Sequence, residues 1–172
     1  MIKIIITTIF LFSFSIFTHA NTDIDKTLNS FHQAASEANL KQYFSLLTDN
    51  AVFLGTDATE RWTKKEFKNF VAPYFSEGHG WTYKTRERHI TVNKDNKSAF
   101  FDELLENKNY GLCRSSGLLY KTAAGWKIAQ YNLSVPLPNE IAKTIVKQIK
   151  QHLQSKNSQA NLAEIKDNKH DN

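Results

Sequence analysis

Glu103 is the side chain that the sequence marks most clearly for chemistry. The residues around it alternate as in a β-strand, so Phe101, Glu103 and Leu105 share one face. A carboxylate between two apolar neighbours is either buried or faces a pocket. In one interpretation Glu103 pairs with an Arg on the next strand and only stabilises the sheet. In the other, the apolar wall raises its pKa and Glu103 acts as a general base.

The strand that follows carries polar groups that could meet Glu103. Arg114 and Ser116 share a face with Leu118. Arg114 is the expected partner of Glu103, and Ser116 adds a hydroxyl. If Arg114 is not taken up by that ion pair, it could instead hold the carboxylate or enolate of a ligand.

The last predicted strand adds amides beside an aromatic ring. Gln130 and Asn132 alternate with Tyr131, and this combination suits recognition of a carbonyl or hydroxyl group. We expect Gln130 to lie inside the fold with Glu103 and Arg114. This strand has no His, so acid–base chemistry here would rest on carboxylates alone.

The loop of residues 55–62 holds a second group of candidates. In the structural interpretation Asp57 caps the turn, Glu60 and Arg61 pair, and Trp62 seals the helix packing. In the functional interpretation Asp57 is a second catalytic carboxylate. Arg61 and Trp62 then contact the ligand at the mouth of the pocket.

Metal and cofactor chemistry are not indicated. The sequence has no CxxC, HExxH or glycine-rich phosphate loop. A zinc site needs three or four converging groups, and the histidines lack metal-ligand spacing, among them His32, His79, His89 and His152. The single cysteine, Cys113, cannot form an internal disulfide and is interpreted as a small packing residue. We therefore expect neither a metal nor a cofactor.

The first 20 residues have the pattern of a secretory signal peptide. Lys3 precedes an apolar run from Ile4 to Phe17, and Thr18-His19-Ala20 supplies small residues for cleavage after Ala20. The run of about 14 residues is shorter than the roughly 20 that span a membrane, so no stable membrane anchor is expected. The sequence predicts a periplasmic or secreted domain.

Charge argues against a nucleic-acid partner. The chain has 22 Lys and Arg residues against 17 Asp and Glu residues, a formal net charge of +5. This excess is small and dispersed, whereas nucleic-acid-binding surfaces concentrate basic residues.

The hydrophobic periodicity changes from helical to strand-like near Trp81. Before it we predict three helices and one short strand, with Thr63 and Glu66 forming a capping box at the third helix. After it we predict an antiparallel meander of four strands: 81–92, 98–106, 110–121 and 126–135. This is an α+β plan in which the strands curl around the helices, making a cone whose open end is a pocket.

The C-terminal segment is predicted to form one more helix and a tail. Apolar residues recur every four positions between Asn139 and Leu153. Three interpretations stay open for this stripe: docking on the domain's own sheet, a dimer contact, or a membrane surface. Residues 155–172 have almost no apolar content and are predicted to be a disordered tail, so the folded domain is 21–154.

Six short motifs accompany this order of elements: Gly55-Thr56-Asp57, Glu60-Arg61-Trp62, Phe101-Asp102-Glu103, Ser116-Gly117, Trp126-Lys127-Ile128-Ala129-Gln130-Tyr131 and Pro138-Asn139-Glu140. Together they resemble the SnoaL-like branch of the NTF2-like superfamily, over about residues 25–150. The resemblance implies an NTF2-like cone. That fold is shared by ketosteroid isomerase, scytalone dehydratase and polyketide cyclases, and also by many binding proteins without catalysis, so it does not give the function.

Two classes of function remain. The first is an exported, homodimeric domain that binds a small, partly apolar molecule in the cone pocket without turnover. The second is a cofactor-independent lyase, isomerase or hydrolase acting on a small carbonyl compound. Glu103 or Asp57 would then be the base, and Arg114, Gln130 and Asn132 would polarise the substrate. The sequence favours binding, because no two groups are spaced so that acid and base roles assign themselves.

Overall fold

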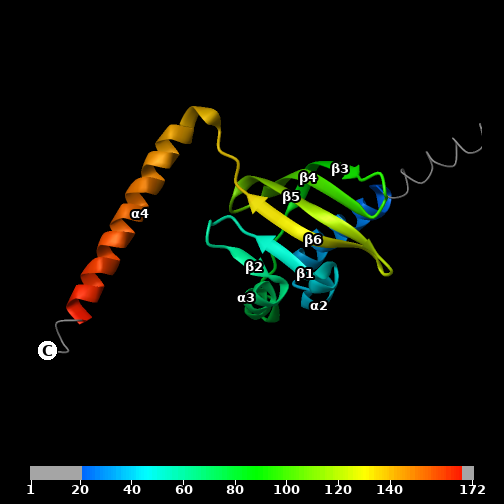
Figure 1. Cartoon of the computed structure of the whole chain (residues 1–172), viewed down its shortest axis with the longest axis horizontal. Coiled ribbons are helices and arrows are strands. Elements are labelled where there is room, and N and C mark those ends of the chain that lie inside the picture. Colours follow the sequence, from blue (N-terminus) through cyan, green and yellow to red (C-terminus); the bar gives the residue numbers. More distant parts are fainter. Residues whose placement is uncertain (1–20, 168–172) are drawn as a thin grey trace, which may run out of the picture. The chain divides into compact units, whose positions relative to one another are not determined.

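The computed structural model describes residues 21–167, so the predicted signal peptide lies outside the described residues. The chain divides into two compact units between Val135 and Pro136. The first unit holds the helices and the sheet, and the second holds the helix α4, Asn139–Asp167 (Figure 1). All site residues discussed below belong to the first unit.

Three helices precede the long strands. The chain is helical over residues 21–36, and its apolar stripe, which includes Ile24, Leu28 and Phe31, is buried. The helices α2 (Leu40–Ser45) and α3 (Lys64–Ser76) follow. Their buried aromatic side chains pack in the same core.

The predicted capping box at the start of α3 is confirmed. The Thr63 hydroxyl accepts from the Glu66 backbone N–H at 3.3 Å, and the Glu66 carboxylate accepts from the Thr63 backbone N–H at 2.8 Å. These bonds satisfy two N–H groups that have no partner within the helix, and so fix where α3 begins.

Six strands form one sheet: β1 (Leu47–Leu54), β2 (Arg61–Thr63), β3 (Lys84–Val92), β4 (Ser98–Asn107), β5 (Gly111–Thr122) and β6 (Gly125–Ser134). Their order is β2-β1-β6-β5-β4-β3. The predicted antiparallel meander is confirmed as β3 to β6. The last strand, β6, then pairs in parallel with β1.

Two strands at the other end of the sheet differ from the prediction. The strand β1, Leu47–Leu54, has eight residues and is longer than the short strand expected before Trp81. The strand β2, Arg61–Thr63, lies where only a loop and a helix start were expected. It pairs with β1 over just three residues, which is too short to give a period-two pattern.

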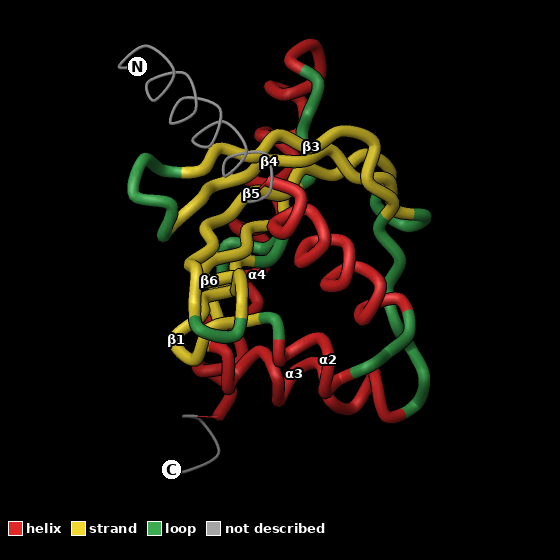
Figure 2. Tube along the Cα trace, turned by 90° about the vertical axis from the view of Figure 1, so that its right-hand side faces the viewer, coloured by secondary structure: helices red, strands yellow, loops and turns green. Residues whose placement is uncertain are grey.

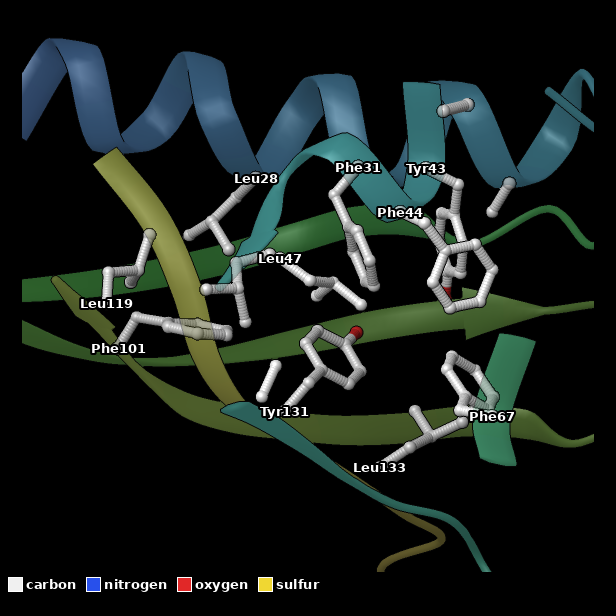
Figure 3. Packing of buried hydrophobic residues seen from close by; sticks show 14 of the residues in the cluster. Leu28, Phe31, Tyr43, Phe44, Leu47, Phe67, Phe101, Leu119, Tyr131 and Leu133 are labelled. Carbon is white, nitrogen blue, oxygen red and sulfur yellow. The ribbon is translucent and has the colours of Figure 1, made fainter. Parts of the chain in front are cut away.

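The sheet is curved, and the helices of the first unit lie against one of its faces, which confirms the α+β cone (Figure 2). The core lies between these two layers. Figure 3 shows Phe31 of the N-terminal helix facing Tyr131 of β6, with ring centroids 5.0 Å apart.

An irregularity in β6 changes which side chains face the core. Leu118 pairs with Gln130 and Leu119 pairs with Ile128, so Ala129 is an extra residue on β6. Such a bulge shifts the alternation by one position. As a result Ile128 and Tyr131 are both buried, and Gln130 is exposed.

The helix α4 runs further than its apolar stripe predicted. It spans Asn139–Asp167, so the expected end at Leu153 was wrong. Residues 155–167 include Gln, Lys and Ala, which favour helix without needing a buried face. The division into leader, domain and tail, and the docking of the stripe, stay predictions. None of the described helices combines the length and the apolar character needed to cross a membrane.

Candidate functional site

A cavity of about 390 Å³ opens between the helices and the sheet of the first unit. Its wall is mainly aromatic: Phe31, Tyr43, Phe53, Trp62, Phe67, Phe70, Tyr74, Trp81, Tyr83, Tyr110 and Tyr131 all line it. Many of these rings stack on one another. Phe53 stacks on Phe67 at 3.8 Å between centroids, and Trp62 stacks on Phe70 at 5.1 Å. A concave, mostly apolar space of this volume is typical of small-molecule sites.

Among the polar side chains that line the cavity, three from different elements are grouped around one imidazole. They are His32 of the N-terminal helix, Tyr83 just before β3, and Tyr131 of β6. The imidazole centroid of His32 lies 6.4 Å from the Tyr83 ring and 6.3 Å from the Tyr131 ring. These groups could orient a polar end of a ligand whose remainder packs on aromatic rings.

Both tyrosines remain neutral donors over the physiological pH range. Burial raises the pKa of Tyr83. Burial, together with the nearby charge of Glu103, raises the pKa of Tyr131, and a hydrogen bond with Ser115 lowers it only in part.

Behind His32 lies Glu103, which is 1% exposed. One oxygen, Oε1, accepts from Ser115 Oγ at 2.7 Å and lies 2.8 Å from His32 Nε2. The other, Oε2, accepts from Arg88 Nε at 2.7 Å and lies 2.7 Å from Arg88 Nη2. Glu103 therefore meets four donor atoms.

Arg88 on β3 connects this carboxylate to the N-terminal helix. Its Nη1 donates to Asp25 Oδ1 at 2.6 Å and to Asn29 Oδ1 at 2.8 Å, and its Nη2 donates to Thr85 Oγ1 at 3.1 Å. The Arg88 side chain is 6% exposed. We call the set Asp25, His32, Arg88, Glu103 and Ser115 the Glu103 network.

The network decides the ionisation of Glu103. Burial alone raises the pKa of this carboxyl, but the hydrogen bond and charge of His32, the charge of Arg88 and the hydrogen bond from Ser115 outweigh burial. Together they lower the pKa to about 2. The predicted general base with a raised pKa is therefore wrong, because Glu103 is a weak base with its acceptor sites already occupied. Glu103 does form a buried ion pair with an arginine, as the other interpretation held, but the partner is Arg88 of the preceding strand and not Arg114.

Arg114 lies on the opposite face of the sheet from Glu103. It is exposed, and across the sheet it pairs in register with Leu104, while Glu103 pairs with Ser115. The prediction that the face of β5 with Arg114 and Ser116 is the inner one is therefore wrong. On that strand the fully buried positions are Cys113, Ser115 and Leu119.

Most of the other polar residues predicted to face the cavity from β5 and β6 do not line it either. Ser116, Gln130 and Asn132 are absent from the described lining of the cavity, and neither Gln130 nor Asn132 is buried. Tyr131 alone of this group lines the cavity. The bulge at Ala129 places Tyr131 and Ile128 on the inner side together, so the prediction of Gln130 inside the cone was wrong.

Each of the two interpretations of the loop before α3 holds for some of its residues. Asp57 caps its turn as predicted, accepting from the Thr59 backbone N–H at 2.8 Å and from the Thr59 hydroxyl at 2.6 Å. Trp62 lines the cavity, whereas Asp57 and Arg61 are exposed and outside its described lining. Glu60 lines the cavity, and among the described residues it makes no ion pair with Arg61.

Sequence reasoning missed His32 and Arg88, although both carry a signal. His32 lies four residues after Leu28 and three before Ala35, so it falls on the buried stripe of the N-terminal helix. Arg88 alternates with Ile90 and Val92, whose side chains turn toward the core. A charged residue in phase with an apolar strand face indicates a buried partner.

Two alternative chemistries find no support in the described part of the chain. No group of three or more His, Cys, Asp or Glu side chains there could hold a metal ion. Cys113 is buried, and burial raises the pKa of its thiol, which disfavours the reactive thiolate.

Comparison with known proteins identifies a family and a fold. The family model of the SnoaL-like domain matches residues 24–138. No curated protein matches the sequence.

Solved structures share the fold at low sequence identity. An NTF2-like protein of Pseudomonas putida KT2440 is 11% identical with a TM-score of 0.60, covering 72% of this chain and 91% of its own. An NTF2-like protein with a cystatin-like fold from Novosphingobium aromaticivorans is 9% identical with a TM-score of 0.59, covering 78% and 93%. A ketosteroid isomerase-like protein of Erwinia carotovora atroseptica is 23% identical with a TM-score of 0.51, covering 68% and 96%.

Proposed function

Since this chain belongs to the SnoaL-like domain family, we propose that its first unit binds a small, partly apolar molecule in the aromatic cavity, without turnover. The observation that carries the proposal is the cavity itself: about 390 Å³, walled by stacked rings, with polar side chains, His32 among them, that can orient a ligand. Pockets that combine apolar walls with few polar groups are built for small molecules.

The ionisable groups favour binding over catalysis. The pKa of Glu103 is near 2, and all of its strong hydrogen-bonding positions are used within the fold. Asp57 is exposed and holds its own turn. The two carboxylates that could have shared acid and base roles thus serve the structure.

Ligand binding can be measured through the tryptophans. Trp62 and Trp81 line the cavity, whereas Trp126 is buried elsewhere in the core, with Lys121 Nζ 5.9 Å from its ring centroid. A panel of small aromatic and alicyclic compounds should quench fluorescence and raise the melting temperature. Trp62→Ala should weaken both responses, and the control Trp126→Phe should preserve them. A panel that shifts neither signal at millimolar concentration would refute the proposal.

Export and self-association complete the proposal. The leader pattern of residues 1–20 supports a periplasmic or secreted protein that starts at Asn21 after cleavage. N-terminal sequencing of the exported protein tests the first point, and an intact leader would contradict it. Sedimentation of the mature chain tests the proposed homodimer.

A second candidate function is cofactor-independent acid–base catalysis by His32. One observation favours it: His32 lines the cavity, and its Nε2 lies 2.8 Å from Glu103 Oε1. A carboxylate in that position can orient an imidazole for proton transfer. An isomerase or lyase acting on a carbonyl compound would use His32, not Glu103, to move the proton. Exchange of α-hydrogens for deuterium in a panel of ketones, lost in His32→Gln, would support turnover. Equal exchange in the two proteins would rule it out.

A further inference from the structure

The charges around the aromatic cavity are unequal in sign. The chain has more basic than acidic residues, yet no Lys or Arg occurs among the described residues lining the cavity. The one carboxylate among them is Glu60, in the turn that joins β1 to β2. An anionic ligand would therefore meet aromatic faces and a negative charge.

Glu60 is held in place but is not neutralised. Its Oε2 accepts from the Asp57 backbone N–H at 3.1 Å. Within the described part of the chain, no Lys, Arg or His forms an ion pair with it. Glu60 is partly exposed, so its remaining lone pairs are open to a ligand.

Gly55 leaves room for the carboxylate of Glu60. A Cβ at position 55 would overlap Glu60 Oε2 and lie 2.9 Å from Glu60 Cβ. Gly55 also lines the cavity. The side chain of Glu60 therefore folds over residue 55 along the cavity wall, and any side chain at position 55 would displace it.

The Glu103 network supplies no net positive charge to the same cavity. It contains two carboxylates, Asp25 and Glu103, against the cations Arg88 and, when protonated, His32. The sum is zero or negative in either state of His32. His79, the remaining histidine of the lining, is exposed and lies 3.3 Å from the Glu77 carboxylate.

The geometry points to an organic cation as the ligand, with an apolar or aromatic body and an ammonium or similar group. Aromatic faces attract cations through their quadrupole, and tryptophan does so most strongly. Trp62, Phe70 and Tyr74 form a continuous series, with centroids 5.1 and 5.5 Å apart, on the side of the cavity formed by β2 and α3. The carboxylate of Glu60 complements this aromatic surface. The inference rests on the proposed binding function and names its ligand class.

Three probes of similar size separate charge from shape. They are benzyltrimethylammonium, its neutral carbon isostere neopentylbenzene, and the anion phenylacetate. Binding is followed by quenching of tryptophan fluorescence in the mature protein. We expect the ammonium to bind about tenfold more tightly than the neutral isostere, and phenylacetate to bind weakest of the three.

Three variants locate the effect. Glu60→Gln removes the charge, and Gly55→Ala keeps the charge but moves the carboxylate. Both should weaken ammonium binding about five- to tenfold, and each should weaken it more than it weakens neopentylbenzene binding. The matched control is Glu37→Gln, because Glu37 is exposed, contacts Gln33 and does not line the cavity. It should have no effect on any probe.

The outcomes distinguish this inference from the proposed function. If neopentylbenzene binds as tightly as the ammonium and Glu60→Gln changes neither, the cation inference fails while the cavity remains a ligand site. Tighter binding of phenylacetate would also overturn the inference. Binding of none of the three probes would count against both.

Discussion

Glu103 and Glu60 are two carboxylates of one domain with opposite surroundings. Glu103 is sealed in the core, and both of its oxygens meet donors from three elements. Glu60 lies in a turn at the cavity, and among the described residues its carboxylate accepts one hydrogen bond, from Asp57. The hydrogen-bond acceptor sites of Glu103 are occupied by donors within the fold, whereas Glu60 has acceptor sites left for a ligand.

The comparison shows that burial alone is a poor guide to a functional carboxylate. A buried charge must be compensated where the chain folds, and full compensation leaves it little capacity to bind or react. A partly exposed charge is tolerated without a protein partner, because water solvates it until a ligand replaces the water. We therefore expect substitutions at Glu103 to change stability, and substitutions at Glu60 to change affinity.

The largest expected effect is on the partner of Glu103. Arg88→Ala should destabilise the fold by about 3–5 kcal/mol, since it leaves Glu103 buried and without its cation. Urea unfolding measures this cost. Arg114→Ala, on the exposed face of the sheet, is the matched control and should change stability by less than about 0.5 kcal/mol. Replacing Arg88 and Glu103 together with Met and Leu should recover much of the loss. Equal costs for Arg88 and Arg114 would contradict the assigned pairing.

The low pKa of Glu103 predicts how stability depends on pH. The pKa of Glu103 falls from 4.5 to about 2 on folding, so the unfolded chain binds the proton more readily. Its contribution is complete above pH 4.5 and is lost as the pH falls from there to about 2. At about 1.4 kcal/mol per unit of pKa, the loss is on the order of 3 kcal/mol. The free energy of unfolding, plotted against pH across this window, should change less for Glu103→Gln than for the natural chain. Parallel curves would show that other groups carry the acid sensitivity.

A smaller effect is expected at Glu66, a carboxylate that is exposed to solvent but hydrogen-bonded within the fold. Glu66 is exposed but completes the capping box with Thr63, and its hydrogen bonds with Thr63 lower its pKa. Thr63→Ala should cost about 1 kcal/mol, because it removes the side-chain acceptor of the helix start. The control Lys68→Ala, exposed on the same helix, should be nearly neutral. A cost as large as that of Arg88→Ala would break the proposed ranking, which follows how fully the fold itself compensates each carboxylate.

The smallest stability effect belongs to Glu60. Glu60→Gln should change the free energy of unfolding by less than about 0.5 kcal/mol, because among the described residues Glu60 forms no ion pair that the substitution would remove. The same variant should alter affinity for a cationic probe. Thermal denaturation with and without benzyltrimethylammonium compares the two effects in one sample. A strongly destabilised Glu60→Gln would mean that Glu60 serves the fold, as Glu103 does.

Local rules were enough for the elements and for the orientation of Glu103. The α+β order, the meander and the capping box follow from hydrophobic periodicity and from residue types three positions apart, which act within one or two turns of chain. The inward direction of Glu103 follows from strand alternation in the same way. Of the predicted ligand-contact residues, Trp62 and Tyr131 line the cavity, although the sequence left Trp62 open between helix packing and ligand contact.

The partners of Glu103 depend on tertiary structure. His32 is 71 positions away in the sequence, and Arg88 reaches both Glu103 on β4 and Asp25 in the N-terminal helix. Their meeting requires the helix to cross the sheet at one particular register, which no local pattern specifies. One extra residue on β6, Ala129, turns Gln130 away from the inner face. Arg114 was predicted inside because the alternation on β5 was assigned to the wrong face of the sheet. Period-two alternation specifies which residues share a face, but packing against the helices decides which face is buried and where a bulge restores the fit.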